Sequence, residues 1–194
     1  MPIKAIIYDL DNTLYPVSAI GERLFAGLFA IIRQSGEAKD RWTEIRKDIM
    51  RRPFQVVALQ YGFSPALTKM ATGHLEHLRY EEPIDTFEDY PIIKEIPGER
   101  FLVTTGFKDL QESKIKAMSI ADDFAERHII DPLHSRLTKK EVFADIMRRR
   151  GYQAGDLLVV GDDPESEIRA AQALGIKTVL YDNCLLYTSD AADE

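Results

Sequence analysis

Hydrophobic residues recur with two different periods along this chain. Residues 3–8 form a short apolar run rich in β-branched side chains, which is typical of a buried strand. From residue 20 to residue 32, hydrophobic residues recur at spacings of three and four, as on one face of an amphipathic helix, and Gly36 is expected to end that helix. The pattern therefore predicts one strand at the start of the chain, followed directly by helical structure.

Helical signals continue up to about residue 80. A charged stretch at residues 38–50 predicts a second helix, and Pro53 separates it from an apolar piece. Ser64 and Pro65 have the cap and first-turn chemistry of a helix start, and that helix is expected to run to about residue 78. We therefore expect residues 15–90 to form a helical module inserted after the first strand.

An acidic segment with three prolines, residues 81–97, is interpreted as a linker, after which strands and helices alternate. Thr138 and Glu141 predict a capping box at the start of one of these helices. The expected strands are 100–104, a short one within 124–130, 156–160 and 177–181, and the expected helices are 109–119, 138–150 and 164–174. Such alternation predicts an α/β protein with a Rossmann-like parallel sheet core and helices on both faces.

The predicted domains are an α/β core made of residues 1–14 and 91–183, and the helical insertion between them. Residues 184–194 show no periodicity and resemble translated adapter sequence. We expect them to be a non-native tail that stands in place of the natural C-terminus.

Composition narrows the class of protein. The 194 residues are 45% hydrophobic and 29% charged, as in ordinary globular domains, and the net charge of −7 argues against a nucleic-acid polymer or an anionic membrane as partner. No apolar run approaches the roughly 20 residues of a membrane span, and the chain begins directly with the predicted strand. The single cysteine, Cys184, allows no disulfide framework. We therefore expect a cytoplasmic protein.

Polar side chains follow three of the predicted strands, where each strand ends. Carboxyl ends of parallel strands meet at one edge of a sheet, which is where ligands bind in such folds. Two carboxylates two residues apart lie on the same side of an extended chain and repel each other. A bound cation would explain the pair, as would separate roles as nucleophile and acid. The plain alternative is a solvated turn at the end of the strand. The residues concerned are Asp9 and Asp11, Thr104 and Thr105, and Asp162 and Asp163.

The chain resembles the haloacid dehalogenase-like hydrolase superfamily in the order of its motifs. These are D-L-D-N-T at residues 9–13, T-T-G at 104–106, a lysine, and G-D-D-P-E-S-E at 161–167. The longer run D-L-D-N-T-L-Y-P is similar to its pyrimidine 5′-nucleotidase-like branch. The resemblance implies a Mg²⁺-dependent phosphatase whose helical insertion is a cap domain. Its substrate would be a small phosphorylated metabolite, such as a nucleoside 5′-monophosphate.

The resemblance also assigns roles at the two aspartates. Asp9 would be the nucleophile that forms an aspartyl-phosphate, and Asp11 the general acid and base. Mg²⁺ prefers oxygen ligands, which Asp9, Asp162 and the backbone carbonyl of Asp11 would supply, with Asp163 or Glu167 close by.

Phosphate binding is assigned to Thr104, Thr105 and a lysine. Lys139 is the preferred lysine, and its neighbour Lys140 competes with it. A solvated cation at a helix start is the plain alternative for either one.

Three other functions fit the same motifs. A phosphomutase uses the same two aspartates, a haloacid dehalogenase needs only the first, and a non-catalytic binding protein could share the fold. Neither the substrate nor the oligomeric state can be read from the sequence.

Overall fold

The computed structural model describes residues 2–182 and is built around a parallel sheet of five strands. The spatial order of the strands is β3-β2-β1-β4-β5, so the first strand of the chain lies at the centre. Their bounds are Ala5–Tyr8 for β1, Glu99–Thr105 for β2, Glu126–Ile130 for β3, Leu157–Gly161 for β4 and Lys177–Leu180 for β5. The predicted α/β class and parallel sheet are confirmed; the prediction for residues 184–194 lies outside the described residues.

Helices separate the strands along the chain, and most lie between β1 and β2. These are α1 (Val17–Leu24), α2 (Ala26–Ser35), the 3₁₀ turn η1 (Lys39–Arg41), α3 (Trp42–Ile49), α4 (Phe54–Tyr61), α5 (Pro65–Glu76) and α6 (Ile92–Glu95). Later come α7 (Lys108–Ala117), η2 (Ala121–Asp123), α8 (Lys139–Arg150), η3 (Ala154–Asp156), the π-helical turn η4 (Pro164–Ile168) and α9 (Arg169–Gln172).

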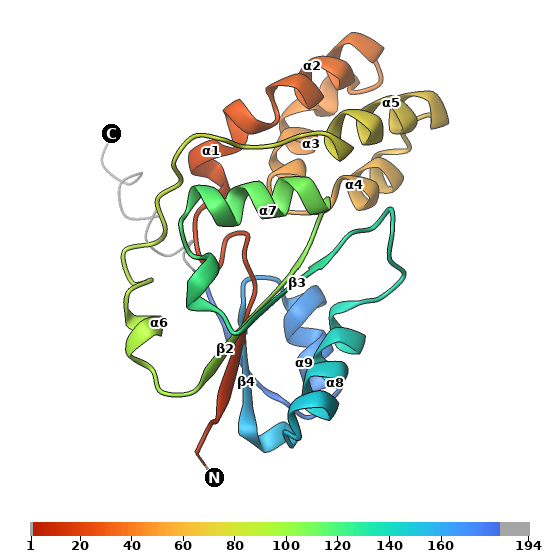
Figure 1. The fold of residues 1–194 in the computed structure, drawn as a ribbon. Helices are drawn as coiled ribbons and strands as arrows, with labels where there is room; N and C mark the ends of the chain where they lie inside the picture. The colour runs from red at the N-terminus through yellow and green to blue at the C-terminus, as the bar shows by residue number, and fades with distance from the viewer. Residues whose placement is uncertain (1, 183–194) are drawn as a thin grey trace, which may run out of the picture.

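Alternate residues of the central strand pack into two different hydrophobic clusters, one on each face of the sheet. Ala5 and Ile7 face a cluster that contains buried residues of α8 and α9. Ile6 and Tyr8 face a larger cluster that contains residues of α7. Figure 1 shows α7 on one side of the strands and α8 and α9 on the other. Burial on both faces explains why residues 3–8 read as a continuous apolar run rather than an alternating one.

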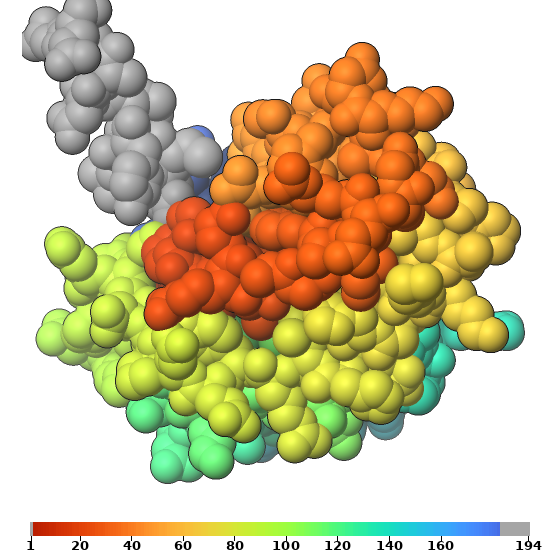
Figure 2. Space-filling view, turned by 90° about the horizontal axis from the view of Figure 1, so that it is seen from above, coloured from red at the N-terminus to blue at the C-terminus, as the bar shows by residue number. Residues whose placement is uncertain are grey.

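The larger cluster extends from the sheet into the helices α1 to α5 without a break. These helices lie beyond the carboxyl ends of the strands (Figure 1). Seen from that side, their red-to-yellow surface, with the segment that follows α5, occupies most of the face of the molecule (Figure 2). Shared hydrophobic burial therefore holds the inserted helices against the edge of the sheet where polar residues were predicted. The boundaries of a separate cap domain stay a prediction.

Several predicted helices differ in their boundaries. The periodic stretch 20–32 is two helices, because the backbone leaves helical geometry at Phe25, which has φ −94° and ψ 9°. The predicted helix 164–174 begins as the π-helical turn η4. The expected caps are present: Gly36 has a left-handed φ of 72°, and Thr138 forms the capping box with Glu141. Amphipathic spacing thus located the helices but not the breaks within them.

Among residues 2–182, no helix has both the length and the apolar character that crossing a bilayer requires.

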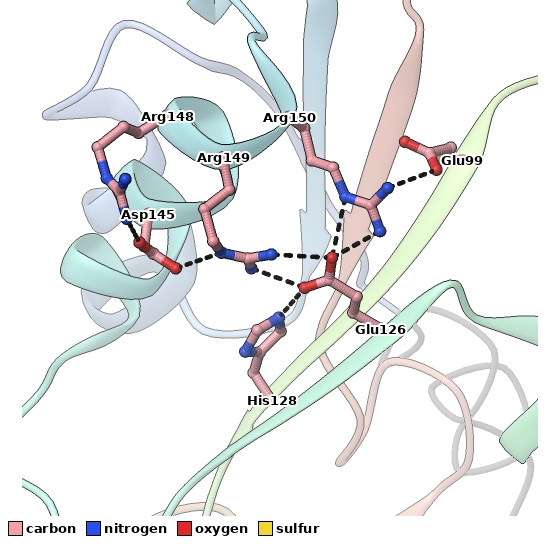
Figure 3. A network of polar contacts seen from close by, with 7 residues as sticks. All are labelled: Glu99, Glu126, His128, Asp145, Arg148, Arg149 and Arg150. Atoms are coloured by element: carbon pink, nitrogen blue, oxygen red, sulfur yellow. Dashed lines mark hydrogen bonds and ion pairs between the residues drawn. The ribbon is translucent and has the colours of Figure 1, made fainter.

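A network of charged side chains ties the end of α8 to the start of β3 (Figure 3). Both carboxylate oxygens of Glu126 accept hydrogen bonds from Arg149, at 2.7 and 3.0 Å, and Oε1 also accepts two from Arg150, at 2.6 and 2.9 Å. His128 Nε2 lies 2.9 Å from Glu126 Oε2. The hydrogen bonds from Arg149 are the main cause that lowers the pKa of Glu126 to about 2.

We expect Glu126→Gln to lower the free energy of unfolding by about 1–2 kcal/mol at pH 7. Because the folded pKa is depressed from 4.5 to about 2, this stabilisation is complete above about pH 5 and is lost as the pH falls towards 2. Urea unfolding of both proteins across that range measures the difference. Glu165→Gln is the control, since the Glu165–Arg169 pair is largely exposed. A stability difference that stays constant with pH contradicts this account.

Candidate active site

The central strand carries Asp9 to the carboxyl edge of the sheet, where the chain turns sharply. Asp9 N still donates to Val160 O of β4 at 3.0 Å, so the aspartate is held in line with the neighbouring strand. Asn12 has a φ of 57°, a left-handed conformation that Asn tolerates better than most residues. Its Oδ1 accepts a hydrogen bond from Val17 N, at the start of α1, at 3.1 Å. The D-x-D-N motif thus combines a strand end with the turn that leads into the helices.

Lys139 joins two carboxylates at the centre of the site. Its Nζ lies 2.5 Å from Asp9 Oδ1 and 2.7 Å from Glu167 Oε2. All three side chains are buried, and Glu167 is only 1% exposed. The capping box fixes the start of α8 so that its first residue, Lys139, points into the site, whereas Lys140 is exposed. Of the two candidate lysines, Lys139 is therefore the one that the structure brings to Asp9.

Three carboxyl groups meet beside this lysine. One oxygen each of Asp9, Asp162 and Glu167 lie within 4.8 Å of one another. Burial, together with the nearby charge of Glu167, raises the pKa of Asp162 to about 7. Burial alone would lower the pKa of Lys139, but the carboxylates of Asp9 and Glu167 outweigh it and raise that pKa. Three carboxyl groups stand around one ammonium group, and their oxygens are suited to a divalent cation.

Glu167 reaches the cluster because Gly161 leaves room for it. A Cβ on Gly161 would lie 2.3 Å from Glu167 Cγ, which is closer than real contacts allow. The π-helical turn η4 carries Glu167, and its Oε1 accepts a hydrogen bond from Asp163 N at 2.7 Å. The glycine and the glutamate of G-D-D-P-E-S-E are therefore one structural unit.

Asp11 has a different set of partners from Asp9. Its Oδ1 accepts hydrogen bonds from Lys114 Nζ, at 2.8 Å, and from the Tyr15 hydroxyl, and its Oδ2 accepts one from Gln111 Nε2 at 2.9 Å. Burial would raise the pKa of Asp11, but the Lys114 ammonium and these hydrogen bonds lower it overall. Both oxygens of Asp11 therefore accept hydrogen bonds, Oδ1 from two donors and Oδ2 from one.

Gln111 also connects Asp11 to the second strand end. Its Nε2 donates to Thr104 Oγ1 at 2.7 Å, and Thr104 is buried at the end of β2. A Cβ on Gly106 would lie 2.9 Å from Gln111 Cδ, so the glycine of T-T-G makes space for this side chain. Thr104 and its neighbour Thr105 both line a cavity at the carboxyl edge of the sheet.

Sequence reasoning missed Lys114, Gln111 and Tyr15. Gln111 and Lys114 are three residues apart on α7, a spacing that places side chains on one helical face. The available signal was a pair of polar residues on one face of the helix that directly follows the T-T-G motif. Nothing in the local sequence indicates that this face is directed at Asp11 rather than at solvent.

The predicted metal residues are divided between different partners. Asp9 and Asp162 belong to the carboxyl cluster with Glu167. Asp11 is bonded as described above, and Asp163 Oδ1 accepts a hydrogen bond from Glu165 N at 2.8 Å. Participation of Asp11 and Asp163 in metal binding stays a prediction.

A cavity of about 140 Å³ opens above these residues and is lined on its far side by the inserted helices. Its floor contains the carboxyl cluster, Lys139, Thr104, and Asp11 with Gln111 and Lys114. Apolar side chains dominate the part that the helices contribute: Val17, Phe25, Leu28, Ile49, Met50, Phe54 and Leu75. Arg51, Arg52 and Gln55, beside Pro53, are the polar members of this part of the lining. The cavity therefore has a charged floor and a largely apolar roof.

Comparison with known sequences gives one family. A profile of the haloacid dehalogenase-like hydrolases matches residues 3–175. A curated relative, glyceraldehyde 3-phosphate phosphatase of Methanopyrus kandleri, is 24% identical over 197 residues, which cover 91% of this chain and 83% of the relative.

Solved structures share the fold at low sequence identity. A haloacid dehalogenase-like family protein of Streptococcus pneumoniae superposes with a TM-score of 0.67 at 18% identity, covering 92% of this chain and 84% of the other. L-2-haloacid dehalogenase of Xanthobacter autotrophicus gives a TM-score of 0.52 at 14% identity, covering 92% and 77%. These similarities extend across the sheet and the inserted helices together.

We expect Gly161→Ala to lower the free energy of unfolding by about 1–3 kcal/mol, because the added methyl group collides with the buried side chain of Glu167. Gly155→Ala is the matched control, since a Cβ there meets no atom within 4 Å, and its effect should stay within about 0.5 kcal/mol. Urea unfolding measures both. Equal stability of the two variants would show that Glu167 moves aside freely.

Proposed function

Since the chain belongs to the haloacid dehalogenase-like hydrolase family, we propose that it is a metal-dependent phosphatase acting on a small phosphomonoester. The observation that supports this most directly is the arrangement at the cavity floor. Asp9 contacts the buried Lys139 and lies beside Asp162 and Glu167, and Asp11 lines the same cavity with partners of its own. Two aspartates in such different surroundings are suited to two different chemical tasks.

Asp9 is the proposed nucleophile. Its carboxylate attacks phosphorus, the bond to the leaving oxygen breaks, and an aspartyl-phosphate forms. Lys139, Thr104 and Thr105 bind the phosphoryl oxygens, so that an ammonium group and hydroxyl or backbone donors neutralise charge as it develops. Positioning and charge neutralisation are the main contributions that a protein makes to phosphoryl transfer.

Asp11 is the proposed general acid and base. In its protonated form it gives a proton to the leaving alkoxide in the first step, and the resulting carboxylate takes one from the attacking water in the second, which restores the starting form. The water then displaces Asp9 from phosphorus and releases inorganic phosphate.

The carboxyl cluster fits a divalent cation. Asp9, Asp162 and Glu167 offer oxygens close enough to share one ion, and Mg²⁺ prefers such ligands. When bound, the ion would neutralise phosphate charge and help to align the phosphoryl group.

Substrate choice is proposed to lie with the inserted helices, which act as a cap over the cavity and exclude water. The apolar roof and small volume favour a compact leaving group. The relative named glyceraldehyde 3-phosphate phosphatase acts, by its name, on a three-carbon substrate of that size. A nucleoside 5′-monophosphate is the alternative substrate, and a phosphate-release screen across triose, sugar and nucleotide monophosphates decides between them. The setting proposed for this reaction is the cytoplasm.

A phosphomutase is the second candidate, since it would use the same two aspartates. The two are distinguished by inorganic phosphate, which a phosphatase releases and a phosphomutase returns to its substrate. A dehalogenase is disfavoured because Asp11, which such an enzyme does not need, has three hydrogen-bond donors built around it.

We expect removal of divalent metal with a chelator to abolish hydrolysis of an aryl phosphate, and addition of excess Mg²⁺ to restore it. Without a cation, the acidic cluster repels the substrate dianion. Phosphate release is the measurement, and thermal unfolding before and after chelation is the control for loss of structure. Full turnover by metal-free protein would refute the metal dependence.

We expect Asp9→Asn to abolish turnover, because an amide is a very poor nucleophile. Asp11→Asn should retain attack by Asp9 and lose proton transfer, which typically contributes about 10²–10⁴-fold. The loss should be larger for an alkyl phosphate than for an aryl phosphate, whose phenol leaves without a proton. An initial burst of phenol followed by slow phosphate release is the expected signature of Asp11→Asn. Equal losses on both esters, with no phosphoenzyme accumulating, would show that Asp11 is not the acid and base.

A further inference from the structure

The buried face of α7 carries two polar side chains that are directed at Asp11. Gln111 and Lys114 are only 1% and 3% exposed, although both are long polar residues that normally reach solvent. We propose that Lys114 and Gln111 are positioning residues that orient the carboxylate of Asp11 for proton transfer. This inference rests on the proposed phosphatase function and assigns to α7 a part in it.

Lys114 is a buried cation whose hydrogen bond goes to Asp11. Burying an ammonium group is costly unless it is paired, and its Nζ lies 2.8 Å from Asp11 Oδ1. The Lys114 ammonium also lies 5.9 Å from the centre of the Tyr15 ring, and the Tyr15 hydroxyl donates to the same carboxylate oxygen. The position of the cation is therefore determined by Asp11 and Tyr15 together.

The two buried lysines of the site serve different aspartates. Lys139 contacts Asp9 and Glu167, whereas Lys114 contacts Asp11. Lys114 therefore does more than add positive charge to the cavity, because its hydrogen bond selects one oxygen of one carboxylate.

Gln111 determines the orientation of the other oxygen. Its Nε2 donates to Asp11 Oδ2 at 2.9 Å and to Thr104 Oγ1 at 2.7 Å. Because Thr104 ends β2, this amide ties the Asp11 carboxylate to a strand end that is proposed to bind phosphate. Gly106 gives the amide its room, as described above. With donors on both oxygens, the carboxylate is held in one rotational state.

Proton transfer is sensitive to such orientation, since donor and acceptor must be within hydrogen-bond reach of each other. Removing the Lys114 hydrogen bond should therefore slow both proton transfers by Asp11, to the leaving group and from water, and leave attack by Asp9 intact. The consequence is a dependence on the leaving group that a purely structural role for Lys114 does not produce.

The test compares Lys114→Met with Lys116→Met, its exposed neighbour on the same helix, in the magnesium-loaded full chain. For Lys114→Met we expect kcat/KM, which reports the steps up to departure of the alcohol, to fall by about tenfold or more on an alkyl phosphate and by less than about threefold on an aryl phosphate. Lys116→Met should match the wild type on both esters. A fall that is equal on both esters overturns the proposal and marks Lys114 as structural.

A double-mutant cycle provides the second measurement. In an Asp11→Asn background, Lys114→Met should cost little further activity on the alkyl ester, because both changes remove the same function. Additive losses overturn the proposal. If Lys114→Met does not fold, Tyr15→Phe and Gln111→Leu decide by the same alkyl-to-aryl ratio: a selective loss on the alkyl ester supports the proposal, and an equal loss refutes it.

Failure of this inference can be distinguished from failure of the proposed function. If the wild-type chain releases phosphate and Asp11→Asn discriminates between the esters while Lys114→Met does not, only the role of α7 is wrong. If the wild-type chain releases no phosphate from any ester, the proposed function and this inference fall together.

Discussion

Negative charge concentrated at one edge of the sheet is the constraint to which the rest of the site is adapted. Asp9, Asp11, Asp162 and Glu167 all line one cavity. Bringing like charges together in a partly buried space is unfavourable unless cations and hydrogen bonds compensate. Two buried lysines do so here: Lys139 enters from the start of α8, and Lys114 from the middle of α7. These helices pack on opposite faces of the sheet, so each face supplies one cation to the same edge.

Close packing around the carboxylates explains why glycines stand at two strand ends. Gly161 leaves space for Glu167, and Gly106 leaves space for Gln111. In both cases the glycine is needed for a side chain that arrives from a later helix, rather than for an unusual backbone conformation, since neither has a positive φ. The glycine of each motif, G-D-D or T-T-G, therefore contacts a side chain that lies several residues further along the chain. A substitution at either glycine acts on the site through the side chain that it displaces.

The inserted helices add an apolar surface to this charged edge. Their hydrophobic cluster is continuous with one face of the sheet, so their packing and the stability of the core are linked. The cavity between them and the strand ends combines a polar floor with an apolar roof. A ligand bound there would have its charged part against the sheet and the remainder among the helices.

Local sequence determined the elements and the strand ends of this protein. The apolar run 3–8, the alternation after residue 97 and the caps at Gly36, Ser64 and Thr138 are short-range signals, and the structure contains each of them. Adjacent strand ends brought Asp9 and Asp162 together as expected, because parallel strands share one carboxyl edge. Only tertiary structure decided that Lys139 rather than Lys140 enters the site and that Lys114 and Gln111 contact Asp11 across about 100 positions of sequence. Helical periodicity tells which residues share a face; which neighbour that face meets depends on how the helix packs against the sheet.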